Sequence, residues 1–277
     1  MSRLRVAPLL GALVLGLVLG GCAPAPAPVP AAGRTAVPPP AAPPATVPTA
    51  DTSVATSAEA AVPAPVVVLD PGHNGGNAAA AREIARAVPD GRGGTKPCNT
   101  TGTETAGGYA EHAFAFDVAA RVTALLTARG IDVRSTRADD DGVGPCVDRR
   151  AAIANDAGAA LTVSIHADSA PASGRGFHVA TSSPALSASQ GAPSEALARD
   201  LVSALTAEGF VGSTYRGEGG LDPRDDLAGL NHARVPAALV ECANMANPAE
   251  AAVVADPDGR RRYADALAAG ILRALGR

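Results

Sequence analysis

The chain has 277 residues, of which 47% are hydrophobic, yet only 3% are aromatic and none is tryptophan. Its formal net charge is −4. A weakly acidic chain has no basic field with which to attract phosphates, so nucleic acid is excluded as a partner.

The N-terminus has the pattern of an export signal. Arg3 and Arg5 precede an apolar run over residues 9–19, and Leu-Gly-Gly-Cys22 follows. The run is shorter than the roughly 20 residues that a membrane span needs. A cysteine in this position resembles the lipobox of bacterial lipoproteins, in which the cysteine becomes the lipidated first residue. We therefore predict a signal peptide over 1–21 and lipidation at Cys22, with ordinary cleavage and a free Cys22 thiol as the alternative.

Residues 22–65 form the next segment, and after Cys22 they are almost entirely alanine, proline, valine and threonine, with hardly any charge. Such a segment cannot bury enough apolar surface to repay its ordering entropy. We predict a disordered linker that holds a domain away from the membrane, so that the protein is extracytoplasmic and anchored to the outer face of the cytoplasmic membrane.

Strand-like and helix-like segments alternate from residue 66 to the end, which predicts a single α/β domain over 66–277. We expect strands over 66–69, 131–136, 161–165, 176–180 and 237–240, and helices over 111–129, 148–157, 194–208 and 258–275. Segments 74–108, 139–147 and 215–231 are rich in glycine, aspartate, proline and threonine, and we interpret them as loops that wall a substrate groove.

Two cysteines, Cys98 and Cys146, fall in these loops. Because disulfides persist outside the cytoplasm, we predict that the two are bonded, which would stabilise the fold by roughly 4 kcal/mol. Free thiols or a pairing with Cys242 are the alternatives. Strand alternation points Cys242 into the core, away from the face that carries Glu241.

Polar groups follow three of the expected buried strands: His73, His166 and Glu241. In α/β proteins, functional groups gather beyond the carboxyl ends of the strands. Two imidazoles and an acid, here Glu111 at a helix start, are the three protein ligands of a catalytic zinc ion. Hydrogen-bonded structural histidines are the alternative. His112 could replace Glu111, but adjacent helical residues diverge by about 100°, so only one of them can face the metal.

Six motifs in this order resemble the zinc-dependent N-acetylmuramoyl-L-alanine amidases of the amidase-3 type, over nearly all of residues 66–277. They are Leu69-Asp70-Pro71-Gly72-His73 followed by Gly75-Gly76, Glu111 before an amphipathic helix, the strand from Gly130-Ile131-Asp132-Val133 to Thr136-Arg137, Arg149-Arg150 with Ala154-Asn155, Ser164-Ile165-His166-Ala167-Asp168, and residues 235–247 around Glu241. Asn74 before the glycines and Cys242 after Glu241 depart from the usual pattern.

The resemblance implies a central twisted mixed sheet flanked by helices, zinc ligands at His73, Glu111 and His166, and a catalytic glutamate at Glu241. It implies an enzyme that hydrolyses the amide between N-acetylmuramic acid and L-alanine in peptidoglycan. We take a monomer as the default oligomeric state. A zinc peptidase acting within the stem peptide, a non-catalytic wall-binding module and a two-carboxylate glycosidase using Glu111 and Glu241 are the competing interpretations.

Several further polar residues have two interpretations each. His178 and His232 are structural or groove-lining. Asp70 and Asp168 either orient the histidines or accept hydrogen bonds from loop amides. The charged run 224–226 is either solvated or in contact with the stem peptide.

Overall fold

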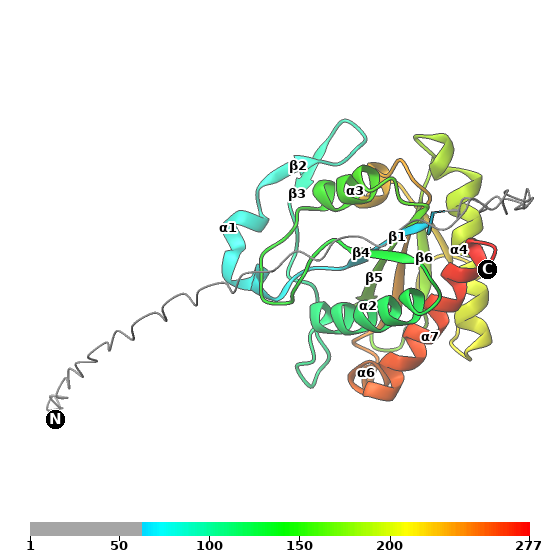
Figure 1. The fold of residues 1–277 in the computed structure, drawn as a ribbon. Coiled ribbons are helices and arrows are strands. Elements are labelled where there is room, and N and C mark those ends of the chain that lie inside the picture. The colour runs from blue at the N-terminus through cyan, green and yellow to red at the C-terminus, as the bar shows by residue number, and fades with distance from the viewer. Residues whose placement is uncertain (1–62) are drawn as a thin grey trace, which may run out of the picture. The chain divides into compact units, whose positions relative to one another are not determined.

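A six-stranded mixed sheet lies at the centre of the domain in the computed structural model, which describes residues 63–277 (Figure 1). Its order is β4-β1-β5-β8-β6-β7. Within this sheet β8 and β6 pair antiparallel and all other neighbours pair parallel, so β6 and β7 run opposite to the other four strands. The strands are β1 (Val66–Pro71), β4 (Asp132–Ser135), β5 (Leu161–Asp168), β6 (His178–Ser182), β7 (Leu221–Arg224) and β8 (Ala237–Asn244). The predicted α/β fold is confirmed, whereas the signal peptide, Cys22 and nearly all of the linker lie outside the described residues.

One face of the sheet builds the main core. Alternate residues such as Val67, Val163 and Val240 are fully buried there, under α2 (Glu111–Thr127), α4 (Ala192–Ala207) and α7 (Pro257–Ala274) (Figure 1). Burying each such side chain contributes about 1.5–3 kcal/mol. No helix within residues 63–277 has the length and apolar character needed to cross a membrane.

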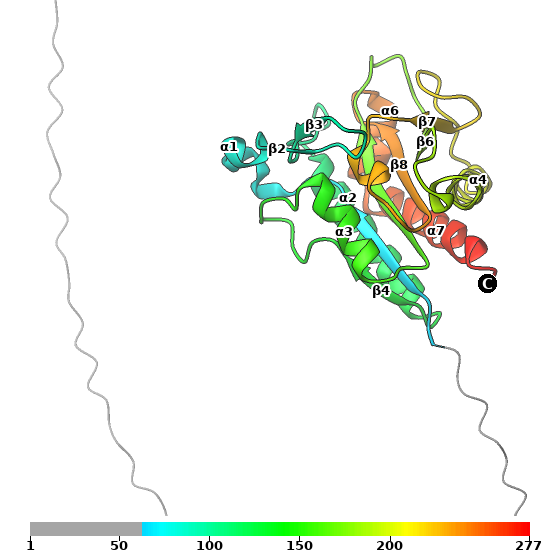
Figure 2. The same cartoon turned by 90° about the horizontal axis from the view of Figure 1, so that it is seen from above.

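The opposite face carries the polar strand ends. It is covered in part by α3 (Val147–Asp156) and the short α5 (Ala228–Asn231) (Figure 2). In the parallel pair β5–β8, His166 lies beside Glu241. Because strand side chains alternate, both point to this second face, at the carboxyl edge of the sheet.

Two of the segments expected to be loops contain regular structure, so that prediction was wrong for them. Segment 74–108 holds η1 (Gly75–Ala80), α1 (Ala81–Ile84) and the hairpin β2 (Ala87–Pro89) and β3 (Thr95–Pro97), and segment 215–231 holds β7 and α5. A further helix, α6 (Pro248–Ala255), was not expected. The hairpin depends on distant partners: Arg92 Nη2 donates to Ser182 Oγ at 3.0 Å, and Lys96 Nζ donates to the carbonyl of Asp226 at 2.6 Å. Elements this short have no periodicity of their own to detect.

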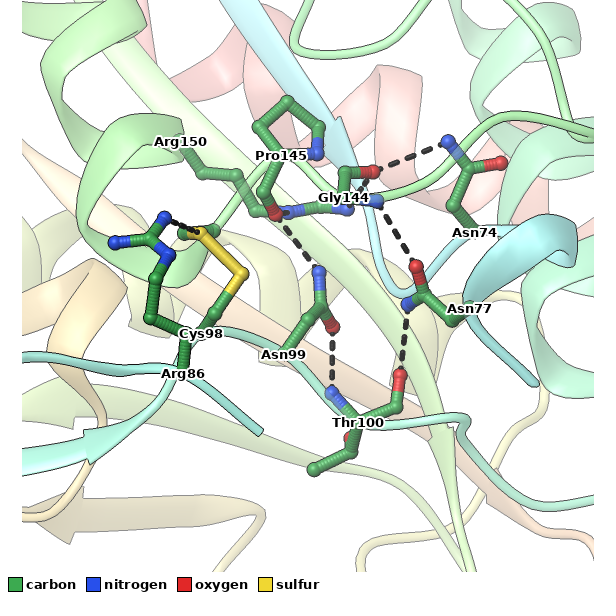
Figure 3. Close-up of a disulfide and its surroundings, with 10 residues drawn as sticks. Asn74, Asn77, Arg86, Cys98, Asn99, Thr100, Gly144, Pro145 and Arg150 are labelled. Carbon is green, nitrogen blue, oxygen red and sulfur yellow. Dashed lines mark hydrogen bonds between the residues drawn. A yellow bond between two sulfur atoms is a disulfide. The ribbon is translucent and has the colours of Figure 1, made fainter. Parts of the chain in front are cut away.

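The structure confirms the predicted disulfide between Cys98 and Cys146, which closes a sequence separation of 48 residues (Figure 3). Asn99 extends this link, since its side-chain amide donates to the carbonyl of Pro145 at 2.8 Å. Cys242 is a free, buried thiol, as the strand alternation predicted. The disulfide therefore joins the two segments that border His73, two residues beyond the end of β1.

Candidate metal centre and active site

Three potential metal ligands converge at the carboxyl edge of the sheet. His73 follows β1, His166 belongs to β5, and Glu111 opens α2 and reaches the same point from the helix layer. Glu111 Oε1 lies 3.1 Å from His73 Nε2 and 2.9 Å from His166 Nδ1. The ligand atoms of the three residues all lie within 4.8 Å of one another. The structure therefore brings together the three predicted ligands, whose positions in the sequence are far apart.

This donor set fits zinc. Zinc bonds of about 2.0–2.1 Å in tetrahedral geometry separate ligand atoms by about 3.4 Å, within a few tenths of an ångström of two of the distances here. Two backbone N–H groups orient the carboxylate: that of Thr103 donates to Oε2 at 3.0 Å and that of Ala167 donates to Oε1 at 3.2 Å. Burial would raise the pKa of Glu111, but hydrogen bonds from His166 and His73 outweigh burial and lower it. The carboxylate is thus held in the ionised form that binds a cation.

His73 is held in one orientation by the segment next to the disulfide. Its Nδ1 donates to the carbonyl of Thr100 at 3.1 Å, which leaves Nε2 facing Glu111. Such a backbone partner on the second nitrogen is what orients metal-binding histidines. The carbonyl of Thr100 also accepts from the side chain of Asn77 at 2.8 Å, so the segment itself is fixed (Figure 3).

The backbone at His73 is strained, because its φ of 56° lies in the left-handed region. A non-glycine residue there costs on the order of 1–3 kcal/mol unless its surroundings impose the conformation. Arg150, which is buried, donates to the carbonyls of His73 at 2.6 Å and Pro71 at 2.7 Å. It also donates to the carbonyl of Gly144 at 3.1 Å (Figure 3). Arg137 donates to the carbonyls of Pro71 and Gly72 at 3.0 and 3.2 Å. Two buried arginines therefore impose the turn that delivers the ligand.

Asp70 supports one of these arginines instead of a histidine. Its Oδ1 accepts from Arg150 Nη1 at 2.7 Å and from Thr136 Oγ1 at 2.6 Å, while Oδ2 accepts from Ser164 Oγ at 2.6 Å. Burial would raise the pKa of Asp70, but Arg150 and these hydroxyls lower it to about 2. Asp70 contacts neither a histidine side chain nor a loop amide directly, and its link to His73 runs through Arg150.

Two glycines allow the ligands to approach this closely. A Cβ at Gly72 would lie 2.2 Å from Cε1 of His166, and a Cβ at Gly102 would lie 2.9 Å from Glu111 Oε2 and 3.0 Å from the His73 ring. The imidazole of His166 thus packs directly on the backbone of Gly72. Glycine is required at position 72 for this contact, although φ there is not positive.

Glu241 lies next to this cluster in the same cavity. The cavity has a volume of about 410 Å³ and is lined by the three ligands and Glu241, among others. Within the described part of the chain, Glu241 Oε2 is buried without a hydrogen-bond partner. Burial raises the pKa of Glu241 well above its usual value, and the carboxylates of Glu111 and Asp168 add to this effect. A buried carboxyl group beside a cation site is suited to exchange protons with a reactant.

The side chains of the other histidines have other partners. His112 follows Glu111 on α2, but its Nδ1 lies 2.8 Å from Asp140 Oδ2. His178 is buried on β6, directly opposite Glu241 in the ladder. His232 Nε2 donates to the carbonyl of Pro89 at 3.1 Å.

The structure gives hydrogen-bond partners to Asp168 and to the charged run 224–226, for each of which the sequence left two roles open. Asp168 Oδ1 accepts from the backbone N–H of Ser169 at 2.7 Å, so this carboxylate satisfies a loop amide. Arg224 Nε donates to Asp226 Oδ1 at 2.7 Å, and Asp226 is largely exposed. The charged run 224–226 is thus paired within itself.

Comparison with known proteins identifies the family. The family model described as N-acetylmuramoyl-L-alanine amidase matches residues 67–273, most of the chain. The chain belongs to the Amidase_3 family. It is an amidase that hydrolyses the bond between N-acetylmuramic acid and L-alanine in peptidoglycan.

Relatives support this assignment over the whole domain. The amidase is 47% identical over 219 residues to N-acetylmuramoyl-L-alanine amidase Rv3717 of Mycobacterium tuberculosis, a match that covers 79% of this chain and 90% of the relative. It is 51% identical to the crystal structure of the amidase Ami1 from Mycobacterium smegmatis, with a TM-score of 0.75 and coverage of 77% and 98%. The apo form of Ami1 from Mycobacterium abscessus is 47% identical, with a TM-score of 0.74 and coverage of 77% and 100%.

Several residues that position the site of the amidase were not identified from the sequence. Gly72, Arg137 and Arg150 each lie within or beside the motifs that carry the family resemblance, so those motifs marked their positions but not their roles. Thr100 and Thr103 act through a backbone carbonyl and a backbone N–H, respectively. No side-chain pattern can reveal a contact of that kind.

Proposed function

We propose that the amidase is a zinc enzyme in which His73, Glu111 and His166 hold the metal and Glu241 moves the proton. The convergence of the three ligand atoms within 4.8 Å supports this assignment. When bound, zinc would supply a water of lowered pKa and would polarise the carbonyl of the scissile amide. Neutral imidazoles and an ionised carboxylate are the protonation states that this role requires.

Glu241 is placed to carry the proton in both halves of the reaction. Its side chain is beside His166 on the same sheet face, and its Oε2 has no partner among the described residues. In the ionised form it takes the proton from the attacking water, and it then returns this proton to the departing nitrogen of L-alanine. A cation held by the three ligands offsets the raised pKa of Glu241, because opposite charge favours the carboxylate.

The test compares the wild-type protein with Glu241→Gln and Glu111→Gln on purified muropeptides, with products read by mass spectrometry and zinc content by elemental analysis. We expect Glu241→Gln to keep one zinc per chain while kcat falls by about 10²–10⁴-fold. Glu111→Gln should lose both zinc and activity. Full activity in the metal-free protein, or in Glu241→Gln, would overturn the assignment.

We also propose that residues 66–277 are the catalytic domain of a monomeric lipoprotein. The basic start, the short apolar run and the cysteine after Leu-Gly-Gly support lipidation at Cys22, and the proline-rich residues 22–65 suit a tether from the membrane to the wall. Mass spectrometry of the protein from membranes should find a diacylglyceryl group on Cys22. Release of Cys22→Ala into the soluble fraction is the expected result, and unchanged membrane retention would contradict it. Sedimentation of the soluble variant tests for a monomer.

A further inference from the structure

A second cavity of about 440 Å³ borders the first, and Glu241 is not among its lining residues. Its polar lining includes Asn74, Thr101, Glu104 and His112. The two cavities share Gly102 and Thr103 as lining residues, and Thr103 is the residue whose N–H binds Glu111. The proposed mechanism does not use this second cavity.

His112 is fixed in orientation at the wall of this cavity. Its Nδ1 donates to Asp140 Oδ2 at 2.8 Å, because a carboxylate can only accept. Arg137, which is buried, fixes both partners: Nη1 donates to Asp140 Oδ1 at 2.7 Å and Nη2 donates to the carbonyl of His112 at 2.8 Å. Within the described residues Nε2 of His112 has no hydrogen-bond partner, so this nitrogen is available to a ligand.

The position of Glu241 sets the direction in which the substrate lies. Glu241 lines the first cavity only, and the departing nitrogen of L-alanine must come to Glu241 to receive its proton. The stem peptide then extends into the first cavity, and the sugar side of the scissile bond points past Gly102 towards the second. The first cavity suits a sugar less well, because the apolar side chains of Ala228, Leu230 and Leu239 are part of its lining. The hydroxyl, amide and imidazole groups of the second cavity match sugar hydroxyls and an N-acetyl group.

We propose that the second cavity binds the glycan portion of the substrate and that His112 recognises it, with Nε2 forming a hydrogen bond with a sugar hydroxyl or the N-acetyl group. This assignment rests on the role of Glu241 proposed above, which sets the direction of the substrate. His112 is a specificity residue here: it contacts the substrate without taking part in the bond cleavage.

The activity test compares three substrates in the full-length enzyme: sugar-free N-lactyl-L-alanyl-D-isoglutamine, the same dipeptide on N-acetylmuramic acid, and the same dipeptide on a peptidoglycan disaccharide. In His112→Ala, kcat/KM for the two sugar-bearing substrates should fall about three- to tenfold, the effect of one neutral hydrogen bond, while kcat/KM for the sugar-free substrate stays unchanged. The matched control is His232→Ala, because His232 lines neither cavity. Equal losses on all three substrates, or no loss, would overturn the proposal.

A binding test separates this proposal from the mechanism. The peptide-free disaccharide is titrated into the zinc-free protein, and the imidazole ¹⁵N signals are followed by NMR. We expect the His112 Nε2 signal to shift, and His112→Ala to bind the disaccharide at least threefold more weakly than His232→Ala. A failure of zinc or Glu241 catalysis leaves this result intact, whereas an unmoved His112 signal refutes the glycan site alone.

Discussion

Replacement of Gly72 by alanine should displace a metal ligand without unfolding the domain. The added Cβ would lie 2.2 Å from Cε1, 2.5 Å from Nε2 and 2.6 Å from Nδ1 of His166. Because carbon contacts are comfortable only near 3.5 Å, the imidazole must move by about 1.3 Å. Zinc sites tolerate deviations of only about 0.2 Å in bond length, so the ring cannot keep its place in the proposed centre.

The expected magnitude follows from this displacement. A misplacement of about 1 Å at a reactive centre costs on the order of 10²-fold in activity, and we expect zinc affinity in Gly72→Ala to fall by about the same factor. Zinc affinity is measured by competition with a chromogenic chelator, and kcat/KM is measured on a muropeptide. Circular dichroism would check that the fold persists.

Gly107→Ala is the matched control for this substitution. Gly107 has no positive φ, and a Cβ there would meet nothing nearer than Thr105 Oγ1 at 3.8 Å. Its zinc affinity and activity should equal those of the wild type. If Gly72→Ala retains zinc affinity within threefold of Gly107→Ala, then the contact with His166 does not position a metal ligand and the reasoning fails.

Three further predictions concern stability. Replacing Cys98 and Cys146 by serine opens a loop of 48 residues. This double substitution should lower the free energy of unfolding, measured in urea, by about 4 kcal/mol. A loss under about 1 kcal/mol would show that the disulfide does not restrict the unfolded chain. The pKa of Asp70 is lowered from 3.8 to about 2, so its ionised form should stabilise the fold by about 2 kcal/mol above pH 4, and this contribution should vanish as the pH falls through 2. Asp70→Asn should lack that pH dependence in urea titrations between pH 2 and 6, and an identical pH profile in both proteins would contradict the sign argued here. Zinc at about 100 times its Kd should raise the free energy of unfolding of the wild type by about 2.7 kcal/mol, seen as a higher Tm, and Glu111→Gln should show no such rise.

The elements predicted correctly are those with enough length to show a period. The helix predicted over 111–129 is observed as Glu111–Thr127, with Phe114, Val118 and Val122 facing the core. The strand predicted over 161–165 is observed as Leu161–Asp168. By contrast, the hairpin of β2 and β3 has three residues in each strand, and partners such as Asp226 that lie more than a hundred residues away hold it in place.

The sequence by itself determined the chemistry of this protein. Its alternating strands and helices specify the layered α/β fold. The histidines and glutamates stand after buried strands and at one helix start, and these positions specify which groups can meet at the sheet edge. Only the tertiary structure decided how those groups are held. The strained turn at His73 depends on Arg150, 77 residues away. Glu111 lies beside His73 and His166, whereas the neighbouring His112 pairs with Asp140. Such contacts arise from the three-dimensional approach of distant backbone carbonyls and carboxylates, which neither periodicity nor spacing along the chain encodes.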